Sequence, residues 1–145
     1  MMIRAFRETD LPAVARMEKE IFSDPRTEES FRDGGPDERI LLSEDGGEIT
    51  GYLAGRFIGD VAELLKLAVS KELQRAGTGS ALLSAFITEA KERGCETLWL
   101  EVRESNLPAI RLYEKHGFVR NGFRRDYYRD PVESAVLYEC DLRKR

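Results

Sequence analysis

The chain contains little histidine, little cysteine and no long apolar run, and each shortage argues against a class of protein. One histidine among 145 residues argues against a histidine-centred metal site or catalytic triad. The two cysteines, Cys95 and Cys140, are too few and too far apart to indicate a disulfide framework or a metal site. No apolar stretch approaches the roughly 20 residues that cross a bilayer, and the first residues do not follow the signal-peptide pattern. We therefore expect a cytoplasmic protein with reduced thiols, no metal and no membrane partner.

The residues that are present suffice for one domain over positions 1–145. A hydrophobic fraction of 41% can supply a single core. The net charge of −4 is spread unevenly: residues 1–65 hold 15 acidic and 8 basic side chains, and residues 66–145 hold 12 acidic and 15 basic ones. The second half therefore suits an anionic cofactor, and the first half suits a basic partner. Ordinary solvated surface charge is the alternative interpretation.

Hydrophobic spacing and turn residues predict the order of helices and strands. Thr9 or Asp10 caps the first helix, Pro12 lies in its first turn, and Gly94 and Asn106 mark the boundaries of later helices. Helices are expected at about residues 10–22, 27–33, 78–93 and 106–116, and strands at about 2–7, 39–43, 49–57, 61–69, 97–103, 118–128 and 132–142. Neighbouring antiparallel strands early in the chain, with alternation of strand and helix later, predict a mixed α/β sheet with helices on both faces.

Residues 64–90 have the pattern of an apolar strand, a loop that holds Gly77 and Gly79, and an amphipathic helix. Glycines at such a turn let backbone N–H groups point outward at the positive end of the helix, where a phosphate can bind. Arg75 adds a positive charge beside the turn. The loop has no lysine after Gly79 and does not follow G-x-G-x-x-G, which excludes two other phosphate loops. A connection that carries glycines without binding an anion is the alternative.

The segment from Gln74 to Gly79 resembles the acetyl-CoA loop of the GNAT superfamily of N-acetyltransferases, whose pattern is Q/R-x-x-G-x-G/A. Residues 98–106, 109–118 and 124–128 are similar to one branch of that superfamily, the RimI-type ribosomal-protein-alanine N-acetyltransferases. The resemblance implies a predominantly antiparallel sheet that is splayed at its centre, with acetyl-CoA as co-substrate. It also implies that acetyl-CoA is bound by the loop and the start of the helix, at Arg75, Ala76, Gly77, Thr78, Gly79 and Ser80.

Glu101 is the candidate general base. Side chains alternate along its expected strand, so the carboxylate shares a face with Trp99, while Leu98, Leu100 and Val102 point the other way. A carboxylate at a strand end is expensive to bury without a purpose, and partial burial makes it a better proton acceptor near neutral pH. The residues alone leave a salt-bridged structural glutamate as the alternative. The resemblance favours the catalytic role, because the proposed base of the RimI branch matches this position.

Tyr113 and Asn106 lie seven residues apart, so they project from one face of the expected helix. A tyrosine at helical spacing is more often a core residue than a catalyst. The resemblance implies that Tyr113 is the general acid that protonates the departing thiolate, and that Asn106 contacts CoA. It further implies that the backbone of Leu67, Ala68 and Val69 binds the pantetheine arm, with one N–H facing the thioester oxygen.

We predict an N-acetyltransferase that acts on a protein N-terminal α-amine. The resemblance implies the N-terminal alanine of a small-subunit ribosomal protein, presented on a basic tail. Acetylation of a lysine or a small amine is the alternative within enzymes, and a CoA-binding module without catalysis is the alternative of another class. Both cysteines are expected within strands with no histidine nearby, so direct transfer is favoured over an acyl-cysteine. No nucleic-acid partner is expected, and the chain is expected to be a monomer or a weak dimer.

Two segments depart from the RimI pattern. Pro25-Arg26-Thr27 stands where the branch has Pro-Trp-Ser/Thr, and residues 131–135 replace an Asp-Gly-x-Glu-Asp-Ala turn. In the family both segments belong to the substrate side. We therefore expect acetyl transfer to be intact, and the acceptor preference to extend to other small first residues.

Overall fold

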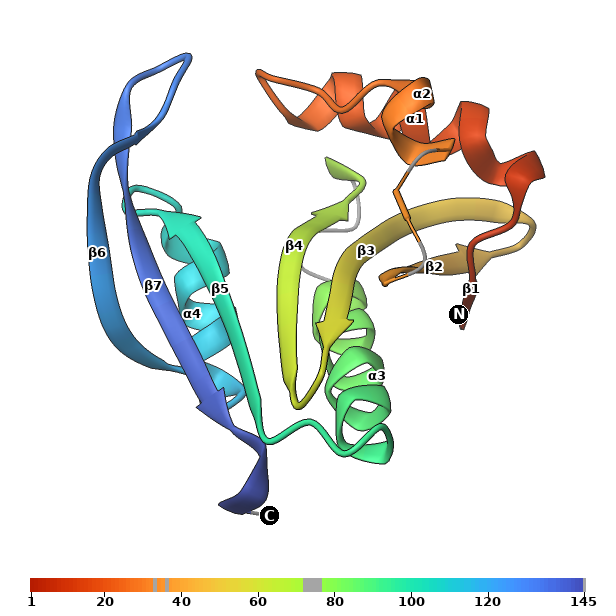
Figure 1. Cartoon of the computed structure of the whole chain (residues 1–145). Helices are drawn as coiled ribbons and strands as arrows, with labels where there is room; N and C mark the ends of the chain where they lie inside the picture. Colours follow the sequence, from red (N-terminus) through yellow and green to blue (C-terminus); the bar gives the residue numbers. More distant parts are fainter. Residues whose placement is uncertain (33, 36, 72–76, 145) are drawn as a thin grey trace.

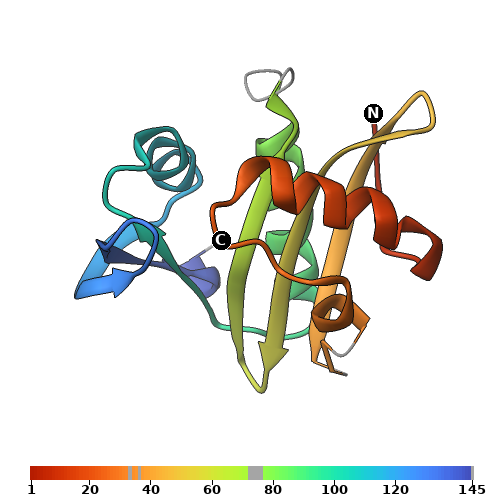
Figure 2. The same ribbon diagram turned by 90° about the horizontal axis from the view of Figure 1, so that it is seen from above.

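The computed structural model describes residues 1–32, 34–35, 37–71 and 77–144, with helices on both faces of one sheet (Figures 1 and 2). The strands are β1 Met2–Ala5, β2 Glu38–Asp45, β3 Glu48–Ile58, β4 Val61–Val69, β5 Thr97–Arg103, β6 Val119–Tyr128 and β7 Glu133–Asp141. The helices are α1 Leu11–Ile21, α2 Glu28–Arg32, α3 Thr78–Glu92 and α4 Leu107–Lys115, with short 3-10 helices η1 Glu8–Asp10 and η3 Leu142–Lys144. The predicted order of strands and α-helices is therefore confirmed.

The seven-stranded sheet has the order β1-β2-β3-β4-β5-β7-β6. Its neighbours are antiparallel except for β4 and β5, which are parallel. The predicted mixed, predominantly antiparallel sheet is thus confirmed. The connection between β4 and β5 runs through α3, as a parallel pair requires a crossover.

Two hydrophobic cores lie on opposite faces of this sheet. The larger core joins α3 and α4 to the central strands, and its buried members include Leu53, Leu64, Phe86, Leu98 and Leu100. The smaller core joins α1 and α2 to β2, β3 and β4, and it includes Val14, Phe31, Leu42 and Tyr52. Figure 2 shows α1 crossing one face of the sheet while α3 lies behind it.

Gly55 lets α3 pack closely against β3. A Cβ on Gly55 would lie 2.3 Å from the ring of Phe86. That ring in turn stacks on Phe57, with 5.2 Å between centroids. Any larger residue at Gly55 would therefore push α3 off the sheet.

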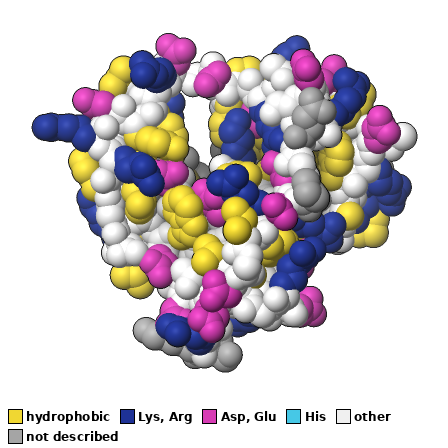
Figure 3. All heavy atoms as spheres, in the orientation of Figure 1, with side chains coloured by type: hydrophobic (Ala, Val, Ile, Leu, Met, Phe, Trp, Pro, Cys, Tyr) yellow, Lys and Arg dark blue, Asp and Glu magenta, His cyan; other side chains and the backbone are white. Residues whose placement is uncertain are grey.

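A β-bulge splits the sheet between β4 and β5. Opposite β3, the register passes from Leu64 to Lys66, which leaves Leu65 as the extra residue. A bulge bends its strand and increases the local twist. The parallel pairing with β5 covers four residue pairs and ends at Leu64 with Leu100. Beyond that point the strands diverge (Figure 1), and the surface is hollowed between the arm of β6 and β7 and the arm of α1 and α2 (Figure 3).

Asp10 precedes α1 as predicted, but its carboxylate does not cap that helix. It accepts hydrogen bonds from the backbone N–H of Arg7 at 2.8 Å and from the Arg4 guanidinium at 2.8 and 2.9 Å. The side chain therefore ties β1 to η1. None of the described helices combines the length and the apolar character needed to cross a membrane.

Candidate active site

The split in the sheet exposes one edge of β4. Beyond Leu64, the strand pairs with β3 on one side, and no described residue of β5 pairs with it on the other. Leu67, Ala68 and Val69 lie along this stretch, so the splay predicted at these residues is present. An extended, amide-bearing group can add to such an edge by strand-type hydrogen bonds. Acetyl-CoA contains such a group in its pantetheine arm, and the edge therefore fits the predicted contact, which stays a prediction.

The first turn of α3 carries outward-pointing backbone donors. Ala81 makes the first backbone hydrogen bond of the helix, donating to the carbonyl of Gly77 at 3.0 Å. The N–H groups of Thr78, Gly79 and Ser80 therefore have no acceptor within the helix. Gly77 has φ of 84°, a left-handed conformation that glycine adopts without strain, and a Cβ there would have no described atom within 4 Å. These features fit a pyrophosphate at the positive end of the helix.

Gly79 places the helix start against the edge of β4. A Cβ on Gly79 would lie 3.4 Å from Leu112, 3.7 Å from Val69 and 3.9 Å from Leu67. The predicted phosphate turn and the predicted pantetheine edge are therefore adjacent, and α4 flanks both of them.

Ser80, the last residue of the predicted turn, contacts the single histidine. Its Oγ lies 2.8 Å from Nε2 of His116, at the C-terminal end of α4. Arg75 and Ala76, the other two predicted contacts of acetyl-CoA, lie outside the described residues.

Glu101 lies in β5 at the split, on the face that turns toward α1 and α2. Leu98, Leu100 and Val102 are buried on the opposite face under α3 and α4, which confirms the predicted alternation. The carboxylate side chain is 14% exposed, and its Oε2 lies 2.6 Å from Nε of Arg124 on β6. That oxygen is buried and accepts no directed hydrogen bond from the part of the chain that the structure describes. Arg124 is therefore its electrostatic partner.

Two tyrosines of β6 adjoin the same carboxylate. Burial and the charge of Glu101 raise the pKa of Tyr127, and the same two causes raise the pKa of Tyr128 to about 12. The guanidinium of Arg103 lies over the ring of Tyr128, 4.5 Å from its centroid. Both phenols are therefore protonated at physiological pH and present O–H groups beside Glu101.

An irregularity in the pairing of β6 positions Arg124, Tyr127 and Tyr128 around Glu101. The pairing with β7 passes from Arg124 opposite Ala135 to Tyr128 opposite Glu133, so residues 125–127 face a single residue, Ser134. Asp126 has φ of 51°, and its N–H donates to the largely buried hydroxyl of Ser134 at 3.1 Å. No role was predicted for Arg124 or Tyr127. Their position within the motif shared with the RimI branch was the one available signal.

Tyr113 lies in α4 and is almost fully buried in the larger core. Its ring packs against Phe118, with 5.7 Å between centroids. Burial, with a smaller contribution from Tyr128, raises the pKa of its phenol well above the ordinary value. The group is therefore a neutral O–H at physiological pH, as a general acid must be before transfer. Its acid role stays a prediction.

Asn106 caps α4, as the sequence predicted. Its side-chain oxygen accepts a hydrogen bond from the backbone N–H of Ala109 at 3.3 Å. The predicted contact of Asn106 with CoA stays a prediction.

The expectation that both cysteines lie within strands is wrong for Cys95. Cys140 lies in β7, but Cys95 lies in the loop between α3 and β5, because the helix ends at Glu92 and the left-handed Gly94 turns the chain. Both thiols are buried, and burial raises the pKa of Cys95, which disfavours the nucleophilic thiolate. Among the described residues, no group of three or more His, Cys, Asp or Glu side chains could hold a metal ion.

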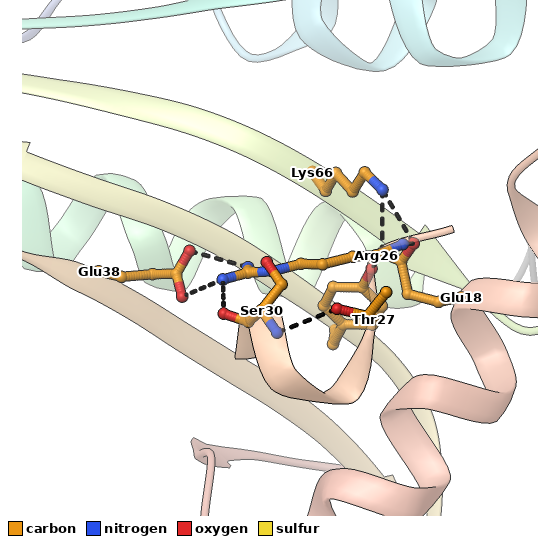
Figure 4. Close-up of polar contacts among 7 residues, drawn as sticks. Glu18, Arg26, Thr27, Ser30, Glu38 and Lys66 are labelled. Carbon is orange, nitrogen blue, oxygen red and sulfur yellow. Dashed lines mark hydrogen bonds and ion pairs between the residues drawn. The ribbon is translucent and has the colours of Figure 1, made fainter. Parts of the chain in front are cut away.

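Arg26, which stands where the RimI pattern has tryptophan, is held by several polar contacts (Figure 4). Its guanidinium donates to both carboxylate oxygens of Glu38 at 2.8 Å and to Ser30 at 2.8 and 2.9 Å. It also lies over the ring of Phe31, 4.4 Å from the centroid. Its backbone N–H donates to Glu18 of α1 at 2.7 Å. The charge is thus paired inside the protein, and the residue holds α1, α2 and β2 together.

Comparisons with known proteins agree with this geometry. Residues 5–118 match the model of the acetyltransferase (GNAT) family. The chain is 38% identical over 139 residues to the [ribosomal protein bS18]-alanine N-acetyltransferase of Escherichia coli, with 93% of each chain covered. It is 32% identical over 138 residues to a putative enzyme of that name from Bacillus subtilis, with 93% of this chain and 91% of the relative covered. The crystal structure of the Escherichia coli enzyme superposes with a TM-score of 0.90 at 35% identity, covering 97% of this chain and 93% of that one.

Proposed function

The chain belongs to the acetyltransferase (GNAT) family and is an N-acetyltransferase that uses acetyl-CoA, and we propose that its acceptor is the N-terminal α-amine of a ribosomal protein. The observation that carries this acceptor is the identity of 38% to the bS18-alanine enzyme over almost the full length of both chains. The whole chain, residues 1–145, forms one catalytic domain. A ribosomal acceptor places the reaction in the cytoplasm.

The site supports direct transfer from acetyl-CoA to the amine. The start of α3, together with Arg75 and Ala76, holds the pyrophosphate, and Asn106 contacts CoA. The edge of β4 at residues 67–69 holds the pantetheine arm, and one of its N–H groups stabilises the charge that develops on the thioester oxygen. Glu101 accepts the proton that the attacking amine loses. Tyr113 gives its proton to the departing thiolate.

One carboxylate suits an α-amine better than a lysine. An α-amine has a pKa near 8 and a lysine near 10.4, so around neutral pH roughly a tenth of α-amines are neutral, against under about 0.1% of lysines. Glu101 lies on the face toward α1 and α2, so the acceptor approaches between that arm and the arm of β6 and β7. The acidic first half of the chain favours a basic N-terminal tail there.

Two peptides of equal sequence test the proposal. One has a free N-terminal alanine, and the other is blocked at its N-terminus and carries an internal lysine. We expect acetylation of the first alone, measured by mass spectrometry, because its α-amine gives up a proton far more readily near neutral pH than a lysine does. A comparable rate on the blocked peptide would identify a lysine acetyltransferase. Peptides that begin with alanine, serine or glycine then measure the expected tolerance of small first residues.

A further inference from the structure

The candidate base is paired in the free protein with a cation that can leave. Nε of Arg124 lies 2.6 Å from Oε2 of Glu101, yet the Arg124 side chain is 52% exposed while that of Glu101 is 14% exposed. The arginine comes from β6, the edge strand of the sheet, next to the irregular residues 125–127. A half-exposed ion pair of this kind contributes only about 0–1 kcal/mol, so it exchanges readily.

The other groups around Glu101 do not replace this cation. Tyr127 and Tyr128 adjoin it from β6 as neutral phenols. Leu137 of β7 is its cross-strand neighbour, and on the β4 side Glu63, which also acts on Tyr127, is paired with Arg56 at 2.7 Å.

Arg103, the next cation along β5, is held elsewhere. It donates to the carbonyl oxygens of Arg129 and Pro131 at 2.9 Å and to Glu133 at 3.3 Å. If Arg124 leaves, the buried oxygen of Glu101 therefore needs another positive charge.

We propose that Arg124 is a specificity-determining residue that competes with the amine of the acceptor for Glu101 and returns when the product is neutral. The inference rests on the proposed role of Glu101 as the base. An incoming ammonium group replaces one cation with another, so Glu101 keeps a counter-ion throughout the exchange. A neutral ligand can occupy the same place only by breaking the ion pair without replacing it, which makes its binding weaker.

The exchange also serves turnover. The ammonium nitrogen transfers one proton to the Glu101 carboxylate, and the resulting neutral amine forms the bond to the acetyl carbon while the bond from that carbon to the CoA sulfur breaks. The departing thiolate takes the proton of Tyr113, and the second proton that the nitrogen loses restores the Tyr113 hydroxyl. Once the amide has formed, the product carries no charge at that nitrogen. The proton passes from Glu101 to solvent, and the guanidinium of Arg124 returns to restore the ion pair of the free protein.

Arg124→Gln tests the exchange, with Arg125→Gln as its matched control. Arg125 is the exposed neighbour on the same strand and has the same charge. We expect Arg124→Gln to bind the N-terminally acetylated peptide about fivefold more tightly, the factor that corresponds to an exposed ion pair of about 1 kcal/mol. Arg124→Lys should restore the wild-type affinity, and Arg125→Gln should not change it.

The sign of the affinity change separates competition from a structural role. A residue that merely shapes the site or binds the peptide would weaken binding when removed, so equal or weaker binding by Arg124→Gln overturns the proposal. Glu101→Gln in the same assay separates this inference from the proposed function. Wild-type turnover in Glu101→Gln would overturn the base assignment and the exchange together. Slow turnover there, with Arg124→Gln behaving like Arg125→Gln, would overturn the exchange alone. In the Glu101→Gln background, Arg124→Gln should no longer tighten binding.

Discussion

The hydroxyl group of Tyr52 donates a hydrogen bond to the carboxylate of Glu18, and neither side chain is reached by solvent. Lys66 of β4 supplies the counter-ion, with its Nζ 2.9 Å from the same carboxylate and 4.3 Å from the centroid of Phe22. A buried carboxylate needs all of its partners. These contacts, with the N–H of Arg26, fasten α1 and the start of α2 to the two strands that form one side of the split (Figure 4).

Tyr52→Phe should therefore destabilise the protein by about 1–3 kcal/mol, because it removes one of the two donors to a buried carboxylate oxygen and leaves only Lys66, at 3.2 Å. Tyr138→Phe is the matched control: Tyr138 is also buried but donates at 3.1 Å to Glu114, whose residue is exposed and can turn to water. It should cost less than about 1 kcal/mol. Urea unfolding measures both, and equal losses would contradict the special role of the Glu18 site.

Gly77→Ala should weaken binding of acetyl-CoA as well as stability. Gly94→Ala is its control, since both glycines have φ of 84°, flank α3 and would place a Cβ with no described atom within 4 Å. Left-handed alanine costs about 1–2 kcal/mol, so both variants should lose similar stability. Only Gly77→Ala should lose affinity for acetyl-CoA by calorimetry, because its Cβ and altered backbone disturb the pyrophosphate turn. A similar loss of affinity in both variants would show that the pyrophosphate does not bind at this turn.

Glu101→Gln should lower turnover by about 10²–10⁴, the range for loss of a general base. Its affinity for acetyl-CoA should stay near that of the wild type, since the predicted contacts of the co-substrate lie on β4, α3 and α4. Steady-state kinetics and calorimetry together check this. Turnover within a factor of two of the wild type would make Glu101 a structural residue that pairs with Arg124.

Tyr113→Phe should slow the chemical step more than it weakens CoA binding, because only the departing thiolate needs the phenolic proton. A thioester with a better leaving group should recover much of the lost rate. Burial holds the pKa of Tyr113 above its usual range, so the wild-type rate should show no loss of this proton between pH 7 and pH 9. Equal single-turnover rates for the two proteins would show that Tyr113 is a core residue without a role as general acid.

Asp10→Asn should reduce stability at neutral pH and much less at low pH. The hydrogen bonds from Arg4 are the main cause that lowers the pKa of Asp10 in the folded state. Its stabilising contribution is therefore present above the unfolded value of about 3.9 and is lost as the pH falls below it. Urea unfolding should show that the difference in free energy of unfolding between variant and wild type is smaller at pH 3 than at pH 7. Asp45→Asn, an exposed aspartate of β2, controls for the lost charge, and a difference equal at both pH values would refute the assignment.

The elements that local chemistry determines could be predicted from the sequence. Asn106 caps α4 as expected because an N-cap needs only the residues that follow it. Gly94 likewise ends α3 with a left-handed turn. Asp10 shows where the same reasoning reaches its limit. Its carboxylate turned away from the helix because Arg4, brought close by the β1 strand, offers a charged donor that a backbone N–H cannot match.

Only those features of the site that follow from local sequence patterns could be predicted. Glu101 could be placed on its strand face by alternation, but its partner Arg124 lies across β7 on another strand, and no local pattern links them. The bulge at Leu65 and the left-handed Asp126 are set by pairing between strands. Arg26 could be recognised as a departure from a family pattern, whereas its bond to Glu38 depends on how α2 meets β2.

The short pairing between β4 and β5 is the hinge about which the two sides of the split sheet can tilt. Glu101 lies on one side and residues 67–69 lie on the other, beyond the last paired residues Leu64 and Leu100. A small tilt at this pairing therefore changes the distance between Glu101 and residues 67–69 without altering the structure of either side. Ala62 and Leu98 are fully buried and face each other within this short pairing, away from Glu101 and residues 67–69. We expect a change in the size of either side chain to alter that distance. Changes in turnover can thus originate in side chains that neither substrate ever meets.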